Sequence, residues 1–243
     1  ASSSQEFLEF TLSFLKEEED NSLKFLSMLL DSPNLTPNAL TKVKDKTLAS
    51  LLAKESDFDY LASSGLSQLL FKNTPLQYPA RGTIPSIQSI TLDQVGAFLK
   101  KSLTLSHLYI VIGGDLDINS SLNKLTQILQ KLPAGEGKNF ESFKANATPQ
   151  TKTQYKQTEQ AYIYFGSPFV LKDYKDEAHK AKVMSFILGA SGFGSRMMEE
   201  IRVKKGLAYS AYMKINLSKL VNYASGYLQT KISNQNQSIE LVK

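Results

Sequence analysis

The sequence predicts an α+β protein, which combines helices and strands within a chain of 243 residues. Apolar residues recur at helical spacing through most of the segment from Lys16 to Leu132, a pattern that favours several amphipathic helices. After residue 160 the sequence contains three strand-like stretches, and in the second of them, from Leu207 to Leu217, apolar and polar residues alternate as they do in a strand with one buried face. A chain of this length can bury a sizeable core in one large or two modest domains.

The composition excludes several classes of function. The net charge is +5, but the lysines and arginines are scattered among 23 acidic residues and form no basic block of the kind that binds nucleic acid. The chain has no cysteine, which excludes disulfides and thiolate metal ligands. No apolar run approaches the roughly 20 residues that a membrane span requires, and no secretory signal opens the sequence. We therefore expect neither a nucleic-acid partner nor a membrane span.

The first part of the chain predicts one strand and then a helix. Alternation from Gln5 to Phe14 predicts a strand, and apolar spacing from Lys16 to Leu30 predicts a helix. Residues 17–20 form an acidic run at the start of this helix. We interpret the run as a solvated first turn that complements the helix dipole, and a divalent-ion site is the alternative.

Two more helices, a loop and a further helix follow. Helices are predicted over residues 36–55, with Pro37 in the tolerant first turn, and over residues 57–71. Prolines and glycines mark residues 73–85 as a loop. Thr91 is a typical N-cap for the helix that comes after this loop.

A short strand and a helix then lead to a linker. Leu108–Ile112 is strongly apolar and predicts a strand, and residues 120–132 predict a helix. Residues 133–150 are poor in large apolar side chains, which indicates a linker between two domains.

After the linker, strands dominate. Residues 160–169, 207–217 and 222–232 predict strands, residues 174–188 predict a helix, and the polar segment from Ser233 resembles the start of another helix. Alternation in the second of these strands places Tyr209 on the same side as Ala211. Tyrosines of the last two strands are interpreted as a cross-strand cluster in the core and not as a ligand cage: Tyr209, Tyr212, Tyr223 and Tyr227.

Residues 191–209 carry start and stop signals for a short helix. Ser195 has the side chain of an N-cap, and Gly206 occupies the position of a left-handed residue after the last turn. Arg202 borders the apolar stripe of this helix, and Tyr209 lies in the strand that follows. By local physics alone, Arg202 is a surface ion-pair member and Tyr209 is a core aromatic residue.

This stretch resembles the signature of a known family. Residues 192–210 read Gly-x-Gly-Ser-Arg-Met-Met-x-Glu-Ile-Arg-x-Lys-Lys-Gly-Leu-Ala-Tyr-Ser, which resembles the second-domain signature of the pitrilysin family of zinc peptidases. That family includes insulysin and mitochondrial processing peptidase. The resemblance implies that Arg202 and Tyr209 contact substrate bound at a zinc ion that the other domain holds. Arg202 would bind substrate or a developing oxyanion, and Tyr209 would donate a hydrogen bond to it.

The resemblance extends to the earlier part of the chain. Residues 56–62, 75–90 and 110–115 resemble further segments of the family. The implied fold is α+β, with mixed, largely antiparallel sheets covered by helices, in two domains that face each other like a clamshell. Residues 1–132 would be the later part of one domain, 133–150 a linker, and 151–243 the earlier part of the second, so that the fold is incomplete at both ends.

The zinc motif of the family, His-x-x-Glu-His with a glutamate well downstream, has no counterpart here. The only histidines, His107 and His179, are far apart and are interpreted as structural residues. The resemblance places the histidine motif upstream of Ala1. It also places Ser50 at the position of the downstream zinc glutamate, and Glu55 lies more than a helical turn away. A neutral hydroxyl is a poor ligand compared with a carboxylate.

Three hypotheses for function follow from the resemblance. In the first, the protein is a non-catalytic member that binds extended peptide or unfolded polypeptide and pairs, as a homo- or heterodimer, with an active zinc subunit. In the second, the chain is part of an active zinc endopeptidase, so that zinc belongs to the full protein or its partner. In the third, it is a structural subunit of a larger complex. In each case, this chain alone is expected to bind no cofactor and to hydrolyse nothing.

Overall fold

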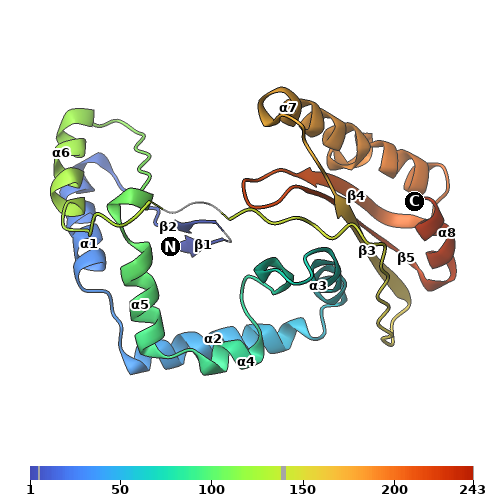
Figure 1. The fold of residues 1–243 in the computed structure, drawn as a ribbon, viewed down its shortest axis with the longest axis horizontal. Helices are drawn as coiled ribbons and strands as arrows, with labels where there is room; N and C mark the ends of the chain where they lie inside the picture. Colours follow the sequence, from blue (N-terminus) through green and yellow to red (C-terminus); the bar gives the residue numbers. More distant parts are fainter. Residues whose placement is uncertain (5, 138–140, 243) are drawn as a thin grey trace. The chain divides into compact units, whose positions relative to one another are not determined.

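The computed structural model describes residues 1–4, 6–137 and 141–242 (Figure 1). The chain divides into two compact units. The helical unit comprises residues 1–49 and 83–139, and the sheet unit comprises residues 50–82 and 140–243. The predicted assignment of residues 1–132 and 151–243 to two family domains stays a prediction.

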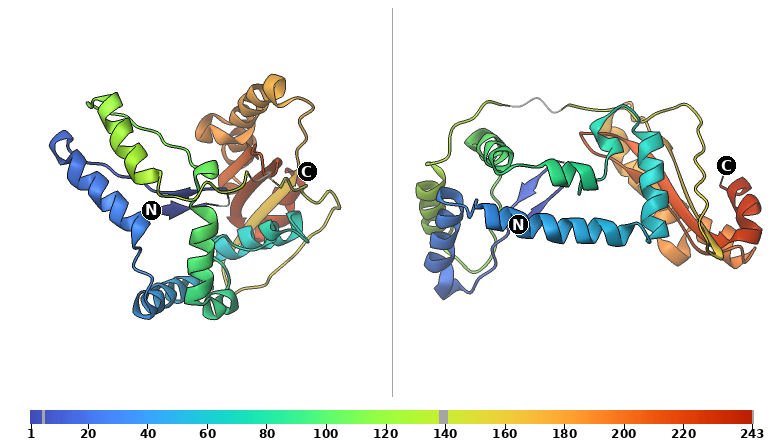
Figure 2. Two further views of the ribbon diagram at one scale, coloured as in Figure 1. Left: turned by 60° about the vertical axis from the view of Figure 1, so that its left-hand side comes forward. Right: turned by 90° about the horizontal axis from the view of Figure 1, so that it is seen from below.

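The helical unit is built around a pair of helices. The 3-10 turn η1 (Lys16–Glu18) leads into α1 (Glu19–Asp31), which packs beside α6 (Ile118–Leu129), as Figure 2 shows. Their contact is apolar, because it buries Leu23, Leu26, Leu125 and Leu129. Both helices confirm the predictions made from apolar spacing.

The acidic run at the start of α1 forms contacts with α6. The Ser121 hydroxyl donates a hydrogen bond to Glu19, and Lys124 Nζ lies 2.9 Å from a Glu19 carboxylate oxygen. Lys124 Nζ also lies 2.6 Å from a carboxylate oxygen of Asp20. The hydrogen bond from Ser121, followed by that from Lys124, lowers the pKa of Glu19. These acids therefore serve the pairing of two helices.

The remaining helices of this unit begin at clear capping residues. The helix α2 (Pro37–Lys54) starts at Pro37 as predicted, and Thr91 forms a capping box at the start of α5 (Leu92–Ser102). A short helix that the periodicity does not predict, α4 (Ile84–Ser89), starts at a second capping box on Thr83. The 3-10 turn η3 (Leu105–His107) follows α5.

The strand predictions in this unit are the least accurate. Leu108–Ile112 forms no strand, and Val111 is 96% exposed. A strand is held by hydrogen bonds to a neighbouring strand, and none of the described strands pairs with this segment. The strand predicted from Gln5 to Phe14 is reduced to β2 (Leu8–Glu9), which pairs with β1 (Ser2–Ser3). Gln5 itself lies outside the described residues.

Three antiparallel strands form the centre of the sheet unit. These are β3 (Gln160–Pro168), β4 (Ala208–Asn216) and β5 (Tyr223–Lys231), in the order β3-β5-β4. All three were predicted as strands from the sequence, and β4 was predicted from the alternation of its residues. The sheet with its covering helices confirms the predicted α+β class with antiparallel strands.

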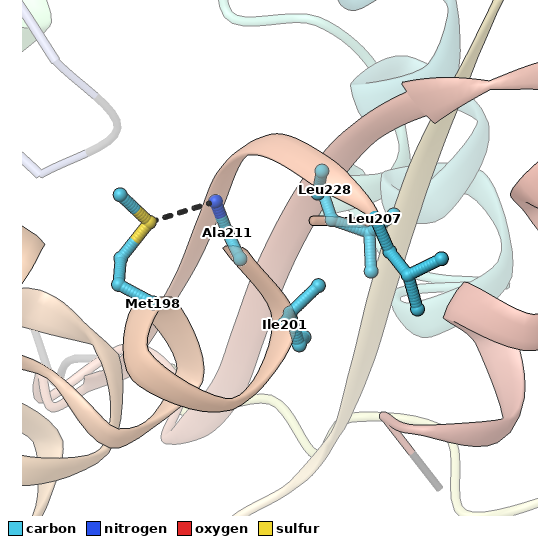
Figure 3. Packing of buried hydrophobic residues seen from close by; sticks show 6 residues of the cluster. Met198, Ile201, Leu207, Ala211 and Leu228 are labelled. Carbon is cyan, nitrogen blue, oxygen red and sulfur yellow. Dashed lines mark hydrogen bonds between the residues drawn. The ribbon is translucent and has the colours of Figure 1, made fainter. Parts of the chain in front are cut away.

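One face of the sheet is covered by helices. The helix α7 (Tyr174–Ser185), its π-helical continuation η4 (Phe186–Ala190) and a second π-helix, η6 (Met198–Val203), pack against β4. Figure 3 shows Met198 and Ile201 of η6 packed with Leu228 of the central strand. Alternate residues of β5 are buried beneath this layer, and Leu228 is only 1% exposed.

The other face of the sheet carries tyrosines and the helix α3 (Phe58–Leu70), which packs against β3. Tyr164, Tyr227 and Tyr212 form a stack across the three strands, with ring centroids 5.5 and 5.8 Å apart. Burial, followed by a hydrogen bond with Asp59, raises the pKa of Tyr164. Tyr223 instead packs edge-on against Phe71, and burial raises its pKa.

Short elements complete the chain. The 3-10 turn η2 (Pro75–Gln77) lies in the predicted loop after α3, and η5 (Gly192–Gly194) lies before η6. The turn between β4 and β5 is held by Ser218, whose hydroxyl accepts hydrogen bonds from the Leu220 and Val221 amides, each at 3.1 Å. The 3-10 turn η7 (Ile232–Asn234) and the helix α8 (Gln235–Glu240) end the chain.

Candidate functional site

The helix that carries Arg202 begins as the sequence predicts. Ser195 is fully buried, and its hydroxyl oxygen accepts a hydrogen bond from the Met198 amide at 3.3 Å, which is the geometry of an N-cap. The turn that follows is π-helical, because the Lys204 amide donates to the carbonyl five residues earlier, on Glu199. Such widened turns are rare in proteins overall, and those that occur are often found at functional sites.

Gly206 ends this helix in the left-handed conformation, with φ at 62°. Its amide donates to the Arg202 carbonyl, and the Leu207 amide donates to the Ile201 carbonyl, both at 3.0 Å. This pattern resembles a Schellman motif in which each bond spans one residue more, since the preceding turn is π-helical. Gly206 therefore has the role that its place in the sequence predicts.

Tyr209 does not lie where alternation predicts. Ala208 pairs with Thr230 and Ser210 pairs with Gln229, so Tyr209 is the extra residue of a β-bulge. The predicted position beside buried Ala211 is wrong: Ala211 is buried, whereas Tyr209 is 76% exposed. The bulge shifts the register by one residue and thereby releases the phenol ring from the core face of the strand.

The structure brings Arg202 and Tyr209 together and adds a third residue. The Arg202 guanidinium carbon lies 5.0 Å from the centroid of the Tyr209 ring and 4.7 Å from that of Phe193. Phe193 lies in η5 and is 71% exposed. Both separations are those of cation–π contacts. Sequence reasoning missed Phe193, although an aromatic residue between two glycines of a loop was a visible signal.

This cluster, formed by Phe193, Arg202 and Tyr209, suits recognition of a carbonyl or carboxylate. Within the described part of the chain, no carboxylate lies within ion-pairing distance of Arg202. Cation–π contacts engage the charge of a guanidinium and leave its N–H donors for an oxygen acceptor. The Tyr209 hydroxyl can act as a second donor.

The neighbouring edge of β4 is closed to an added strand. The outward amide of Ala211 donates to the Met198 sulfur at 3.4 Å (Figure 3), and that of Ile215 donates to the Ser185 hydroxyl at 3.0 Å. Between them, Gly189 lies so close to the Met213 backbone that a Cβ atom would lie 2.3 Å from its nitrogen. A ligand at the cluster therefore contacts side chains more readily than the backbone of residues 211–215.

The residues considered for zinc do not form a metal site. Ser50 lies in α2, and its hydroxyl oxygen accepts a hydrogen bond from Arg81 Nη1 at 3.3 Å. His107 belongs to the helical unit, where its Nδ1 lies 3.1 Å from the Thr104 hydroxyl, and His179 lies in α7 of the sheet unit. A guanidinium beside the hydroxyl opposes a cation at Ser50, so these residues do not fit zinc.

Among the residues that the structure describes, no group of three or more histidine, cysteine, aspartate or glutamate side chains could hold a metal ion. Over the same residues, no helix is both long enough and apolar enough to cross a membrane.

The fold and the cluster together define an α+β domain in which the arginine and the tyrosine of the signature lie in contact. Residues 89–243 match the family model described as the peptidase M16 inactive domain, and the chain belongs to this family. This is the family to which the pitrilysin and mitochondrial processing peptidase relatives belong, as the resemblance implied.

Two curated relatives illustrate the range of the family. The chain is 52% identical over 240 residues to "Non-peptidase homolog YmxG" of Helicobacter pylori, an alignment that covers 99% of this chain and 55% of that protein. It is 27% identical over 166 residues to an "Uncharacterized zinc protease" of Streptomyces coelicolor, which covers 65% of this chain and 34% of that protein. The chain thus spans about half the length, or less, of these relatives.

Solved structures share the fold. A peptidase M16 inactive domain from Pseudomonas fluorescens superposes with a TM-score of 0.80 at 24% identity, over 93% of this chain and 55% of that one. A chain of Complex III2 from Candida albicans superposes with a TM-score of 0.71 at 18% identity, over 90% of this chain and 54% of that one. Proteins of this fold therefore occur in multi-subunit complexes.

Proposed function

We propose that this chain is a peptide-binding, non-catalytic part of an M16-family protein and completes the chamber of an active zinc subunit. The cluster of Phe193, Arg202 and Tyr209 is its substrate-contact site. The partner is a second family member, in a homo- or heterodimer, and the ligand is extended peptide or unfolded polypeptide. Zinc belongs to the active subunit.

One observation carries this proposal: an arginine without a carboxylate partner among the described residues lies within cation–π distance of two exposed aromatic rings. Exposed aromatic residues and arginine are enriched where proteins bind other chains. Extended peptide offers a carbonyl oxygen at every residue, which is the acceptor that a guanidinium edge and a phenol can share.

The non-catalytic assignment is supported by a separate observation. At Ser50, where the resemblance expects a zinc glutamate, a hydroxyl contacts a guanidinium and no carboxylate ligand is present. A relative that is 52% identical to this chain over 240 aligned residues has the name "Non-peptidase homolog". Both features favour a role in binding over a role in hydrolysis.

Two other functions have their own support. Relatives named as zinc proteases favour an active enzyme in which other parts of the protein supply the metal motif. The likeness to a chain of Complex III2 favours a structural subunit. Peptidase activity that a chelator abolishes would support the first of these functions. Tight stoichiometric association without affinity for peptide would support the second.

Fluorescence anisotropy with a labelled unfolded peptide tests the proposal. We expect saturable binding by the chain and at least about tenfold weaker binding by Arg202→Ala, because the edge donors are lost. Lys205→Ala is the matched control, since it removes a nearby exposed cation that contacts neither ring, and it should change affinity less than about twofold. Equal affinity of Arg202→Ala and the unchanged chain would refute the site.

A further inference from the structure

A hollow lies in the sheet unit, between the end of α2, the start of α3 and the loop before α4. It has a volume of about 410 Å³. Its wall is largely apolar but includes polar side chains, among them Ser50, Lys54, Tyr60, Ser64 and Arg81. A hollow of this size is large enough for a small ligand. It does not include Phe193, Arg202 or Tyr209.

Arg81 gives this hollow a positive charge. Among the described residues, no carboxylate lies within ion-pairing distance of Arg81. Within the described ranges, its one side-chain hydrogen bond runs from Nη1 to the Ser50 hydroxyl, at 3.3 Å. A guanidinium has five N–H donors, so most of its donors remain for a ligand. Lys54 adds less charge, because its Nζ lies 2.5 Å from a carboxylate oxygen of Asp57.

The hydroxyl groups of the wall complete a set of donors. The Ser63 and Ser67 hydroxyls are already committed, since they donate to the Tyr60 and Ser63 carbonyls at 3.0 and 3.2 Å. Ser50, which accepts from Arg81, keeps its own proton for donation. With Tyr60 and Ser64 on the same wall, a ligand oxygen can receive hydrogen bonds from neutral donors beside the guanidinium.

We propose that the hollow at Ser50 and Arg81 binds a small oxyanion, a carboxylate or a phosphate group carried by a small ligand. Its chemistry is opposite to that of a metal site, because its wall offers N–H and O–H donors and a cation where a zinc site offers carboxylate and imidazole ligands. Arg81 supplies the paired donors that planar oxyanions prefer, and Ser50 holds one guanidinium nitrogen in place. This inference does not depend on the proposed peptide site.

NMR titration of the whole chain with inorganic phosphate, and separately with acetate, tests the inference. Either anion should shift the amide signals of residues near Ser50 and Arg81 in a saturable way. Arg81→Gln should weaken binding at least tenfold. Lys72→Gln loses the same charge from an exposed position outside the hollow, and its affinity should remain within twofold.

A second variant keeps the test decisive if Arg81→Gln fails to fold. Ser50→Glu places a carboxylate beside Arg81 and should also abolish anion binding, while the peptide affinity stays unchanged. Binding of both anions identifies a general oxyanion site. Preference for phosphate or for acetate shows whether the natural ligand carries a phosphate or a carboxylate group. Equal anion affinity in Arg81→Gln and the unchanged chain, or zinc that binds saturably and displaces phosphate, would overturn the inference.

Discussion

A guanidinium in cation–π contact with two aromatic rings keeps its N–H donors and loses rotational freedom. Arg202 makes both contacts, one with Phe193 and one with Tyr209. A free arginine side chain loses roughly 2 kcal/mol of rotamer entropy when it is fixed by a ligand. Prior stacking therefore reduces the cost of binding at Arg202, and both rings contribute to this organisation.

The contribution of Phe193 can be measured. Phe193→Leu keeps an apolar side chain but removes the ring, and an exposed cation–π contact contributes about 0.5–1 kcal/mol. We expect peptide affinity to fall by about two- to fivefold in fluorescence anisotropy, with the same thermal stability. Phe193→Tyr preserves the ring and should restore the affinity.

If Phe193→Leu binds peptide as tightly as the unchanged chain, Phe193 does not position Arg202. If Phe193→Tyr loses as much peptide affinity as Phe193→Leu, the aromatic ring alone does not account for the contribution of Phe193.

At the scale of elements, two irregularities bring the three residues together. The π-helical turn of η6 and the bulge at Tyr209 lie on either side of Gly206. The end of the bulge is anchored by Thr230, whose hydroxyl donates to the Leu207 carbonyl. Regular elements would have given a buried tyrosine, as the alternation predicts, so the site depends on deviations from regular geometry.

Pairing of α1 with α6 makes a prediction about pH. The hydrogen bonds from Ser121 and Lys124 lower the pKa of Glu19 below its ordinary value of 4.5. A carboxyl group whose pKa is lowered in the folded state stabilises the fold at pH values above its ordinary pKa. This stabilisation is lost as the pH falls through the folded-state pKa. Glu19→Gln should therefore lower the Tm at neutral pH, on the order of 1–3 °C, and the difference should shrink below pH 4.5.

Thermal unfolding followed by circular dichroism at pH 7 and at pH 3 checks this expectation. Glu17→Gln is the matched control, because Glu17 is exposed and belongs to the same acidic run. A Tm difference for Glu19→Gln that is as large at pH 3 as at pH 7 would show that the effect is not one of charge.

At the scale of the whole molecule, the two units have different chemical character. The sheet unit holds the aromatic cluster and the hollow at Ser50, and His107 and His179 are divided between the units. The chain belongs to a peptidase family, yet its described residues include no group of three or more side chains that could hold a metal ion. This arrangement makes a prediction about metal.

We expect that EDTA changes neither the Tm nor the peptide affinity of this chain. A metal that binds only the native state raises the Tm increasingly as its free concentration exceeds its Kd, so added zinc should give no increase over magnesium at equal ionic strength. Differential scanning calorimetry measures this directly. A rise in Tm that is specific to zinc and grows with its concentration would contradict the non-catalytic role proposed for the chain.

Several features of the site could be predicted from sequence because their causes are local. An N-cap at Ser195 and a left-handed residue at Gly206 depend on a few neighbouring residues, and both were predicted. The strand at residues 108–112 was wrongly predicted, because a strand also requires a partner that periodicity cannot supply. The substrate-contact role of Arg202 and Tyr209 stays a prediction.

The sequence by itself determined the α+β class, most helix boundaries, the three antiparallel strands and the family, since periodicity, capping residues and a contiguous signature are written in neighbouring positions. Only the tertiary structure decided that Phe193 joins Arg202, that Tyr209 leaves the core face, and that Ser50 meets Arg81. These contacts join residues from different elements, or depend on the register between two strands. They arise from packing and hydrogen bonding across the fold, which the order of residues along the chain does not display.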